Sequence, residues 1–146
     1  MVKAAITGVG GYVPETILCN KDLEQMVDTT DEWILSRTGI KERRILKEPY
    51  QGCSTLAVRA AQDLIEKKGI DPKSIDLVLI ATITPDYQVA ATAAYVASSI
   101  GATNAFAFDL SAACSGFLYG MSVATGYIQS GRYNRVLFIG ADKMSS

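Results

Sequence analysis

Histidine is absent from this sequence, although one cysteine stands where a nucleophile could be presented. The 146 residues include three cysteines and no histidine. Because catalysis by a Cys–His pair needs both side chains, these residues alone cannot complete such a pair. The cysteines show no CxxC spacing, so the sequence predicts neither a disulfide framework nor a bound metal.

An excess of charge is lacking too. Lys and Arg number 14 against 15 for Asp and Glu, which gives a formal net charge of -1. A balanced chain has no overall attraction for nucleic acid or a membrane surface, so we expect neither as a partner. The sequence contains no apolar run long enough to cross a bilayer, and its first residues do not resemble a secretory signal. We therefore expect a cytoplasmic protein with reduced cysteines.

A complete dinucleotide-binding glycine motif is also missing. Gly8, Gly10 and Gly11 invite that reading, but Val13 stands where the third glycine of GxGxxG belongs. Pro14 follows, where a phosphate-binding helix should already be running. The glycines are interpreted as a tight turn, and a phosphate-binding oxidoreductase is a remote alternative.

What the chain does contain is enough apolar sequence for a core, at 49%. Its length suits one domain, 1–146, and apolar runs alternate with amphipathic stretches. Strands joined by crossover helices imply an α/β fold with a mainly parallel sheet, whose functional groups gather beyond the strands' carboxyl ends. The predicted strands are 3–8, 75–82, 105–108 and 136–140. The predicted helices are 21–27, a short helix between a cap at Thr30 or Asp31 and a stop at Gly39, 54–68, 90–100 and 115–129.

The candidate nucleophile is Cys114, in the stretch DLSAACSGFLYG over 109–120. It lies between a predicted strand and a predicted helix, where the positive end of the helix dipole favours thiolate. The alternative is a buried, inert cysteine. The sulfur is left sterically open by four small neighbours: Ala112, Ala113, Ser115 and Gly116.

A second candidate site lies in DTTDEWILSRTGIKERR, over 28–44. Asn20 is a plausible N-cap for the predicted helix 21–27, which precedes this segment. Within the segment, Thr30 or Asp31 can cap the next helix, and Gly39 can end that helix. Trp33 and Arg37 are four residues apart and hence share a helix face. An indole with nearby basic groups suits a phosphate-bearing nucleotide. The alternative is a core aromatic beside a solvated charge cluster made of Arg37, Lys41, Arg43 and Arg44.

Three segments together resemble one known family. In order along the chain, VDTTDEWILSRTGIKERR, ATITPD and DLSAACSGFLYG are similar to segments of β-ketoacyl-acyl carrier protein synthase III, of the thiolase-like superfamily. The resemblance covers the N-terminal half of such an enzyme. It implies a layered α/β fold with a mainly parallel central sheet, forming one of two pseudo-symmetric halves.

The resemblance makes Cys114 the catalytic nucleophile. It implies that Cys114 accepts an acyl group from acyl-CoA and passes it to malonyl-acyl carrier protein, with decarboxylation, to start fatty-acid synthesis. The backbone N–H of Cys114 would form half of an oxyanion hole, and the C-terminal half of the enzyme would supply the second donor, a His and an Asn. The resemblance implies no permanently bound cofactor, because the CoA thioester is a substrate.

The same resemblance assigns binding roles. Trp33 and Arg37 would contact the adenine and phosphates of CoA, and Thr29 would add a contact, with a helix cap as its alternative role. The resemblance also implies that the protein forms a homodimer. Val89 replaces the phenylalanine of an FPSTA-like segment that bounds the acyl pocket, so we expect longer or branched acyl groups to be accepted.

Two further interpretations stay open. A related acyl-CoA condensing enzyme could make a polyketide starter, a quinolone or a hydroxymethylglutaryl product. From another class, the chain could be a non-catalytic dimerisation or acyl-binding module, which the absence of histidine supports.

Overall fold

The computed structural model describes residues 3–145. Their contacts divide the chain into two compact units. The sheet unit comprises Gln51–Met144 and the N-terminal residues up to Tyr12, and the hairpin unit comprises Val13–Tyr50. Both junctions between the units contain glycine and proline, which punctuate structure: Gly10, Gly11, Pro14, Pro49 and Gly52.

The sheet unit is built on three parallel strands. β3 (Leu77–Ala81) lies between β4 (Phe106–Leu110) and β5 (Val136–Gly140). Every residue of β3 is buried, as a continuous run of apolar residues predicts for a central parallel strand. The predicted parallel sheet is therefore confirmed, and β5 has the predicted bounds.

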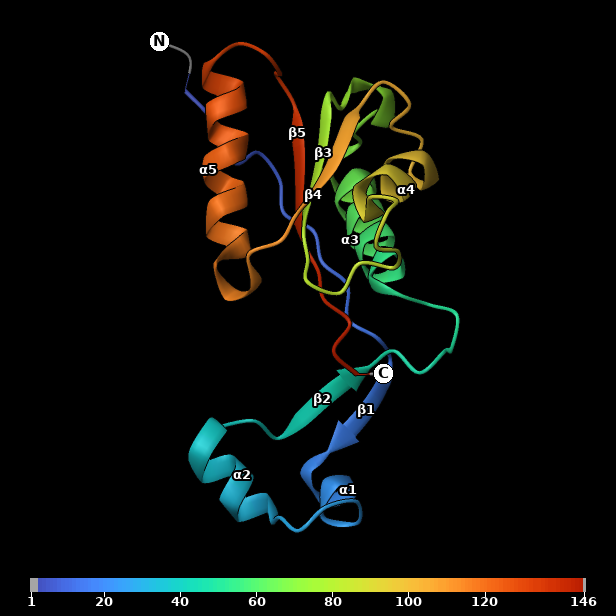
Figure 1. Cartoon of the computed structure of the whole chain (residues 1–146), viewed down its shortest axis with the longest axis vertical. Coiled ribbons are helices and arrows are strands. Elements are labelled where there is room, and N and C mark those ends of the chain that lie inside the picture. The colour runs from blue at the N-terminus through green and yellow to red at the C-terminus, as the bar shows by residue number, and fades with distance from the viewer. Residues whose placement is uncertain (1–2, 146) are drawn as a thin grey trace. The chain divides into compact units, whose positions relative to one another are not determined.

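Helices cover both faces of this sheet. α3 (Cys53–Lys68) and α4 (Thr92–Ser99) pack on one face, while α5 (Gly116–Gln129) packs on the other (Figure 1). Pro72–Ser74 and Ala113–Ser115 form short 3-10 turns. The core joins apolar side chains of α3, α4 and the strands, including Ala57, Ala61, Val78, Ile80, Val96, Leu137 and Ile139.

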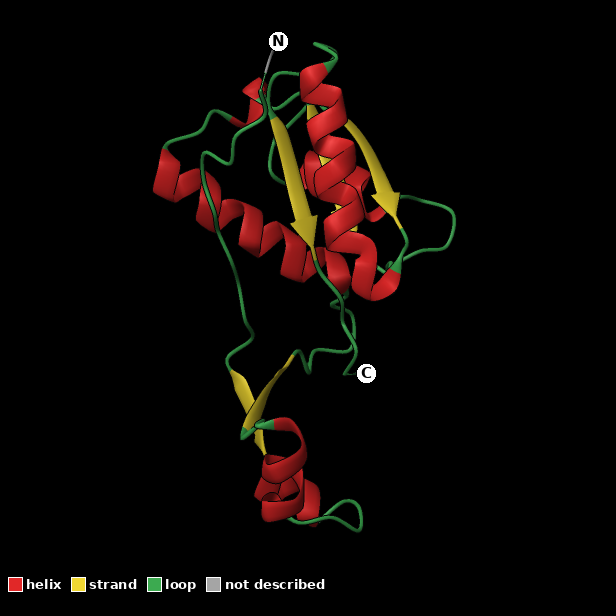
Figure 2. Cartoon of the chain, turned by 90° about the vertical axis from the view of Figure 1, so that its left-hand side faces the viewer, coloured by secondary structure: helices red, strands yellow, loops and turns green. Residues whose placement is uncertain are grey.

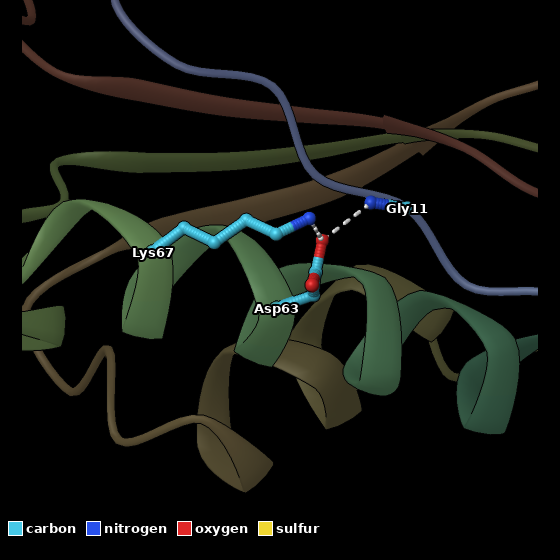
Figure 3. A network of polar contacts seen from close by, with 3 residues as sticks. All are labelled: Gly11, Asp63 and Lys67. Carbon is cyan, nitrogen blue, oxygen red and sulfur yellow. Dashed lines mark hydrogen bonds and ion pairs between the residues drawn. The ribbon is translucent and has the colours of Figure 1, made fainter.

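The predicted strand over 3–8 is wrong. The segment has no strand pairing and instead follows α3. Gly11 N–H donates to the Asp63 carboxylate over 3.0 Å, and Lys67 Nζ donates to the same oxygen over 2.7 Å (Figure 3). The bond from Lys67 lowers the pKa of the Asp63 carboxyl most, and the bond from Gly11 lowers it further. The expected burial is wrong as well, because Ile6 is 71% exposed and no residue of 3–8 is buried.

Gly10 lets the backbone of this segment approach α3. A Cβ at Gly10 would lie 2.7 Å from the Leu64 backbone nitrogen and 2.8 Å from the Ala60 carbonyl oxygen. Main-chain atoms within a helix cannot move aside cheaply. Gly11, the next residue, has open space at the same position.

We therefore expect Gly10→Ala to lower the free energy of unfolding by about 1–3 kcal/mol, the usual cost of overpacking. Gly11→Ala is the matched control and should change it by less than about 0.5 kcal/mol. Urea unfolding followed by circular dichroism measures both. Equal stabilities for the two variants would contradict the close approach at Gly10.

The hairpin unit pairs β1 (Thr16–Cys19) with β2 (Glu42–Ile45) in antiparallel register, Thr16 facing Ile45. Between these strands the chain forms α1 (Asn20–Glu24) and α2 (Asp31–Thr38) (Figure 2). The sequence analysis missed both strands, since the four residues of β2 include three charged ones. α1 is also shorter than predicted.

The expected helix signals in this unit have mixed outcomes. Thr30 Oγ1 accepts from Trp33 N–H over 3.1 Å, and Gly39 ends α2 with φ 71°, so both predictions are confirmed. The prediction that Asn20 caps α1 is wrong. Cys19 holds the cap position, and Asn20 is buried within the helix. None of the helices among residues 3–145 is long and apolar enough to cross a membrane.

Candidate active site

Cys114 is exposed on a turn that joins β4 to α5. The sequence predicted the start of an α-helix, and the structure places a 3-10 turn there first, Ala113–Ser115. Ala113 has φ 45°, a left-handed conformation that residues with a Cβ rarely adopt. Such strain costs about 1–3 kcal/mol and concentrates at functional sites. The fold thus holds the thiol on a constrained turn at the carboxyl end of a parallel strand.

Close packing of α5 fixes this turn. A Cβ on the buried Gly116 would lie 3.3 Å from Ala81 Cβ, at the end of β3, and one on Gly120 would overlap the Phe138 ring. The Phe117 ring stacks on the Phe138 ring, with centroids 4.8 Å apart. The first turn of α5 therefore sits directly against the strand ends. The N–H groups of a first turn have no partner within their own helix, and they lie next to Cys114.

A carboxylate in β4 ties the turn to α4. The two carboxylate oxygens of Asp109 accept the backbone N–H groups of Thr92, over 2.7 Å, and Ala93, over 2.8 Å. α4 needs this cap because Ala91, at its N-cap, has no capping side chain. Asp109 thereby connects the strand before Cys114 with the segment after the exposed Val89. The sequence analysis did not single out Asp109.

A second carboxylate joins the ends of β3 and β5. Asp142 Oδ1 accepts from Thr82 Oγ1 over 2.9 Å, from Ile83 N–H over 2.8 Å and from Thr84 Oγ1 over 3.2 Å. The sequence signal for this contact was a hydroxyl or acidic residue just after each apolar strand. It does not reveal that the two strand ends meet.

Cys53 contrasts with Cys114. It is 1% exposed, its thiol donates to the Ala141 carbonyl over 3.0 Å, and its sulfur lies 3.3 Å from Thr82 Oγ1. Burial, reinforced by the Asp86 and Asp142 carboxylates, raises the pKa of the Cys53 thiol to about 11. Cys53 is the inert, buried cysteine of this chain.

We expect iodoacetamide at pH 8 to alkylate Cys114 well before Cys53. With a pKa of about 11, only about a thousandth of the Cys53 thiol is ionised at pH 8, and the side chain is also out of reach of the reagent. Peptide mapping after timed quenching measures each rate. In urea the two rates should converge, and equal rates in the folded chain would overturn this assignment of the thiols.

The second candidate site lies in the hairpin unit. The Arg37 guanidinium carbon is 5.8 Å from the Trp33 ring centroid, so the predicted shared helix face is confirmed. Trp33 is 57% exposed, which leaves indole surface available for stacking. Trp33 and Thr29 line a shallow pocket of about 260 Å³ together with Asp28 and Thr30.

The basic cluster proposed from the sequence divides into two pairs. Arg43 donates to the Asn20 side-chain oxygen, and Arg44 lies 3.6 Å from Glu42 and donates to the Pro14 carbonyl. Arg37 and Lys41 form no ion pair within residues 3–145. Thr29, Trp33 and Arg37 are thus brought together, while Cys114 belongs to the sheet unit.

Known proteins match both the sequence and the fold. The family model for 3-oxoacyl-[acyl-carrier-protein] synthase III matches residues 108–146. A β-ketoacyl-[acyl-carrier-protein] synthase III of Bacteroides thetaiotaomicron is 54% identical over 145 residues, which cover 99% of this chain and 43% of that protein. The chain thus spans less than half the length of such relatives. Within the described part of the chain, no group of His, Cys, Asp or Glu residues could hold a metal ion.

Two solved structures place the fold. The 3-oxoacyl-[acyl-carrier-protein] synthase III of Aquifex aeolicus superposes with TM-score 0.91 at 44% identity, over 99% of this chain and 46% of that one. The priming β-ketosynthase of a polyketide biosynthetic pathway superposes with TM-score 0.88 at 39% identity, over 94% of this chain and 41% of that one.

The parallel sheet, with a cysteine turn at its carboxyl edge, and the match to these structures define a thiolase-like α/β fold. Within that fold the chain is similar to β-ketoacyl-[acyl-carrier-protein] synthase III proteins, of which it spans less than half.

Proposed function

We propose that this chain carries the acylation half of a condensing enzyme that starts fatty-acid synthesis, with Cys114 as the catalytic nucleophile. The observation that carries the proposal is the exposed thiol on a strained turn at the sheet's carboxyl edge. The similarity to β-ketoacyl-[acyl-carrier-protein] synthase III proteins supports it. In this proposal residues 1–146 form one of two pseudo-symmetric halves of a cytoplasmic enzyme.

The first step is acyl transfer. The Cys114 sulfur attacks the thioester carbonyl of acyl-CoA, the bond from that carbon to the CoA sulfur breaks, and CoA leaves with the proton of the thiol. The backbone N–H of Cys114 would stabilise the oxyanion that forms on the carbonyl. A thioester keeps the acyl group activated, so this step needs no permanently bound cofactor.

The second step uses malonyl-acyl carrier protein. Loss of carbon dioxide generates a carbanion that attacks the acyl carbonyl, a carbon–carbon bond forms, and Cys114 is released. The product is 3-ketoacyl-acyl carrier protein. The chain contains no histidine. We therefore assign the His of this step, together with the Asn that the resemblance implies, to the C-terminal half, which would act as the partner of this chain.

Two surfaces of the sheet unit are suited to binding further protein chains. A groove of about 850 Å³ runs between the N-terminal segment, α5 and β5, and in the described chain β5 pairs only with β3. We assign this groove to the C-terminal half. On the other side, β4 is also an edge strand, and Phe106 and Tyr95 are each 58% exposed, which supports a homodimer.

Intact-mass spectrometry with acetyl-CoA tests acylation. We expect one acetyl group to be added when the C-terminal half is supplied, because that half would contribute the second oxyanion donor. The adduct should disappear in Cys114→Ala and persist in Cys53→Ala. An unmodified Cys114 in the reconstituted enzyme would support a non-catalytic module and overturn the proposal.

An acyl chain-length series in the same assay tests the wider primer range expected from Val89.

Fluorescence of Trp33, the sole tryptophan, tests CoA binding. We expect CoA to quench it, because the adenine would stack on the exposed indole. Arg37→Ala should raise the Kd about tenfold by removing a charge-assisted phosphate contact. Lys21→Ala, which removes an equal charge from an exposed position on α1, should leave the Kd unchanged. Equal losses in both variants would indicate only a general charge effect.

A polyketide-priming enzyme is the second candidate, favoured by the match to the priming β-ketosynthase. The product of the complete enzyme distinguishes the two. Our proposal requires 3-ketoacyl-acyl carrier protein that enters fatty acids, and a free or CoA-bound product would oppose it.

A further inference from the structure

Asn20 is the most completely bonded side chain of the hairpin unit. It is 1% exposed, although asparagine is usually a surface residue. Its Nδ2 donates to Asp31 Oδ1 over 2.7 Å and to the Ile40 carbonyl over 2.8 Å, while its Oδ1 accepts from Arg43. Both donors of the amide and its acceptor are therefore used.

The partners of Asn20 lie at both ends of α2. Asp31 is the first residue of that helix, and Ile40 lies just beyond its last residue, Thr38. One buried amide thus holds the start and the end of α2 at the same time. Arg43 extends the bonding to β2.

Apolar packing alone gives α2 little support. Only Ile34 of its eight residues is buried. A helix this short is unstable by itself in water, so its position depends on the contacts at its ends. Trp33 and Arg37 both lie on α2, and neither is among the hydrogen-bond partners of Asn20 in the described chain.

We propose that Asn20 is a positioning residue for the nucleotide site: its buried amide fixes α2 so that Trp33 and Arg37 face the CoA nucleotide together. This inference rests on the proposed CoA-binding function. Asn20 itself touches no substrate. It acts through the orientation of the helix that carries the two binding side chains.

The chemistry of the site requires an amide. An aspartate at position 20 would keep the shape and the bond from Arg43. Its second oxygen, in the place of Nδ2, would however face both the Asp31 carboxylate and the Ile40 carbonyl oxygen. Both contacts would become repulsive, in a buried place where unpaired polar groups are costly. Asp31→Asn is different, because an asparagine oxygen still accepts from Asn20.

Three variants of the full chain form the test, with Trp33 fluorescence reporting CoA binding. We expect Asn20→Asp to raise the Kd at least about tenfold, the result of a misplaced Trp33–Arg37 pair. Asp31→Asn should bind as the unmodified chain does. The double variant, Asn20→Asp with Asp31→Asn, restores a donor–acceptor pair between the two positions and should recover part of the lost affinity.

A second readout separates positioning from general damage to the fold. In the enzyme reconstituted with the C-terminal half, we expect Asn20→Asp to slow acylation of Cys114 by acetyl-CoA. Acylation by S-acetyl-N-acetylcysteamine, a thioester without the nucleotide, should keep its rate. A merely structural role would slow both reactions.

The outcomes distinguish the two levels of the proposal. If the unmodified chain binds no CoA, the proposed function fails, and this inference fails with it. If that chain binds CoA and Asn20→Asp binds equally well, the inference about Asn20 alone is wrong. Slowing of both thioesters, or no recovery in the double variant, also overturns it.

Discussion

The close approach of α5 to the sheet is the constraint on which the Cys114 turn depends. A Cβ on Gly120 would overlap the Phe138 ring, and one on Gly116 would be in tight contact with Ala81 Cβ, at 3.3 Å. Because the helix lies so close, the chain must turn sharply between β4 and α5, and Ala113 takes up that turn in a left-handed conformation. The exposure of the thiol is therefore a consequence of helix packing. A larger residue at either glycine would displace the start of α5.

Sequence periodicity predicted the sheet unit well and the hairpin unit poorly. The strand at 136–140 and the buried run around β3 were evident because parallel strands, buried on both faces, are continuously apolar. β2 is charged and only half-buried in alternation, so hydrophobicity gave no signal for it. The segment over 3–8 failed for the opposite reason. It is apolar like a strand, but its partner is a helix.

The candidate sites divide in the same way. Cys114 and the Trp33–Arg37 pair could be found because local spacing and turn chemistry place them. Asn20, Asp109 and Asp142 could not, because what matters about them is a partner distant in sequence. Asp142 bonds to Thr82, 60 residues away, and Asn20 to Arg43, 23 residues away. A single sequence shows that such residues are polar, and it does not show that they are buried and bonded.

The contrast between two cysteines explains how one fold can keep a reactive thiol apart from an inert one. Cys53 lies in the polar network between the strand ends, where burial and the neighbouring carboxylates oppose ionisation. Cys114 lies on a turn beyond the same edge of the sheet, exposed and next to the start of α5. Under the proposed function, CoA binding at Trp33 and Arg37 supplies affinity from a part of the substrate that does not react. Such affinity strengthens substrate binding without altering the surroundings of the Cys114 sulfur. Under the same proposal, recognition and acyl transfer rest on different residues, so substitutions in α2 should alter the first without altering the intrinsic reactivity of the thiol.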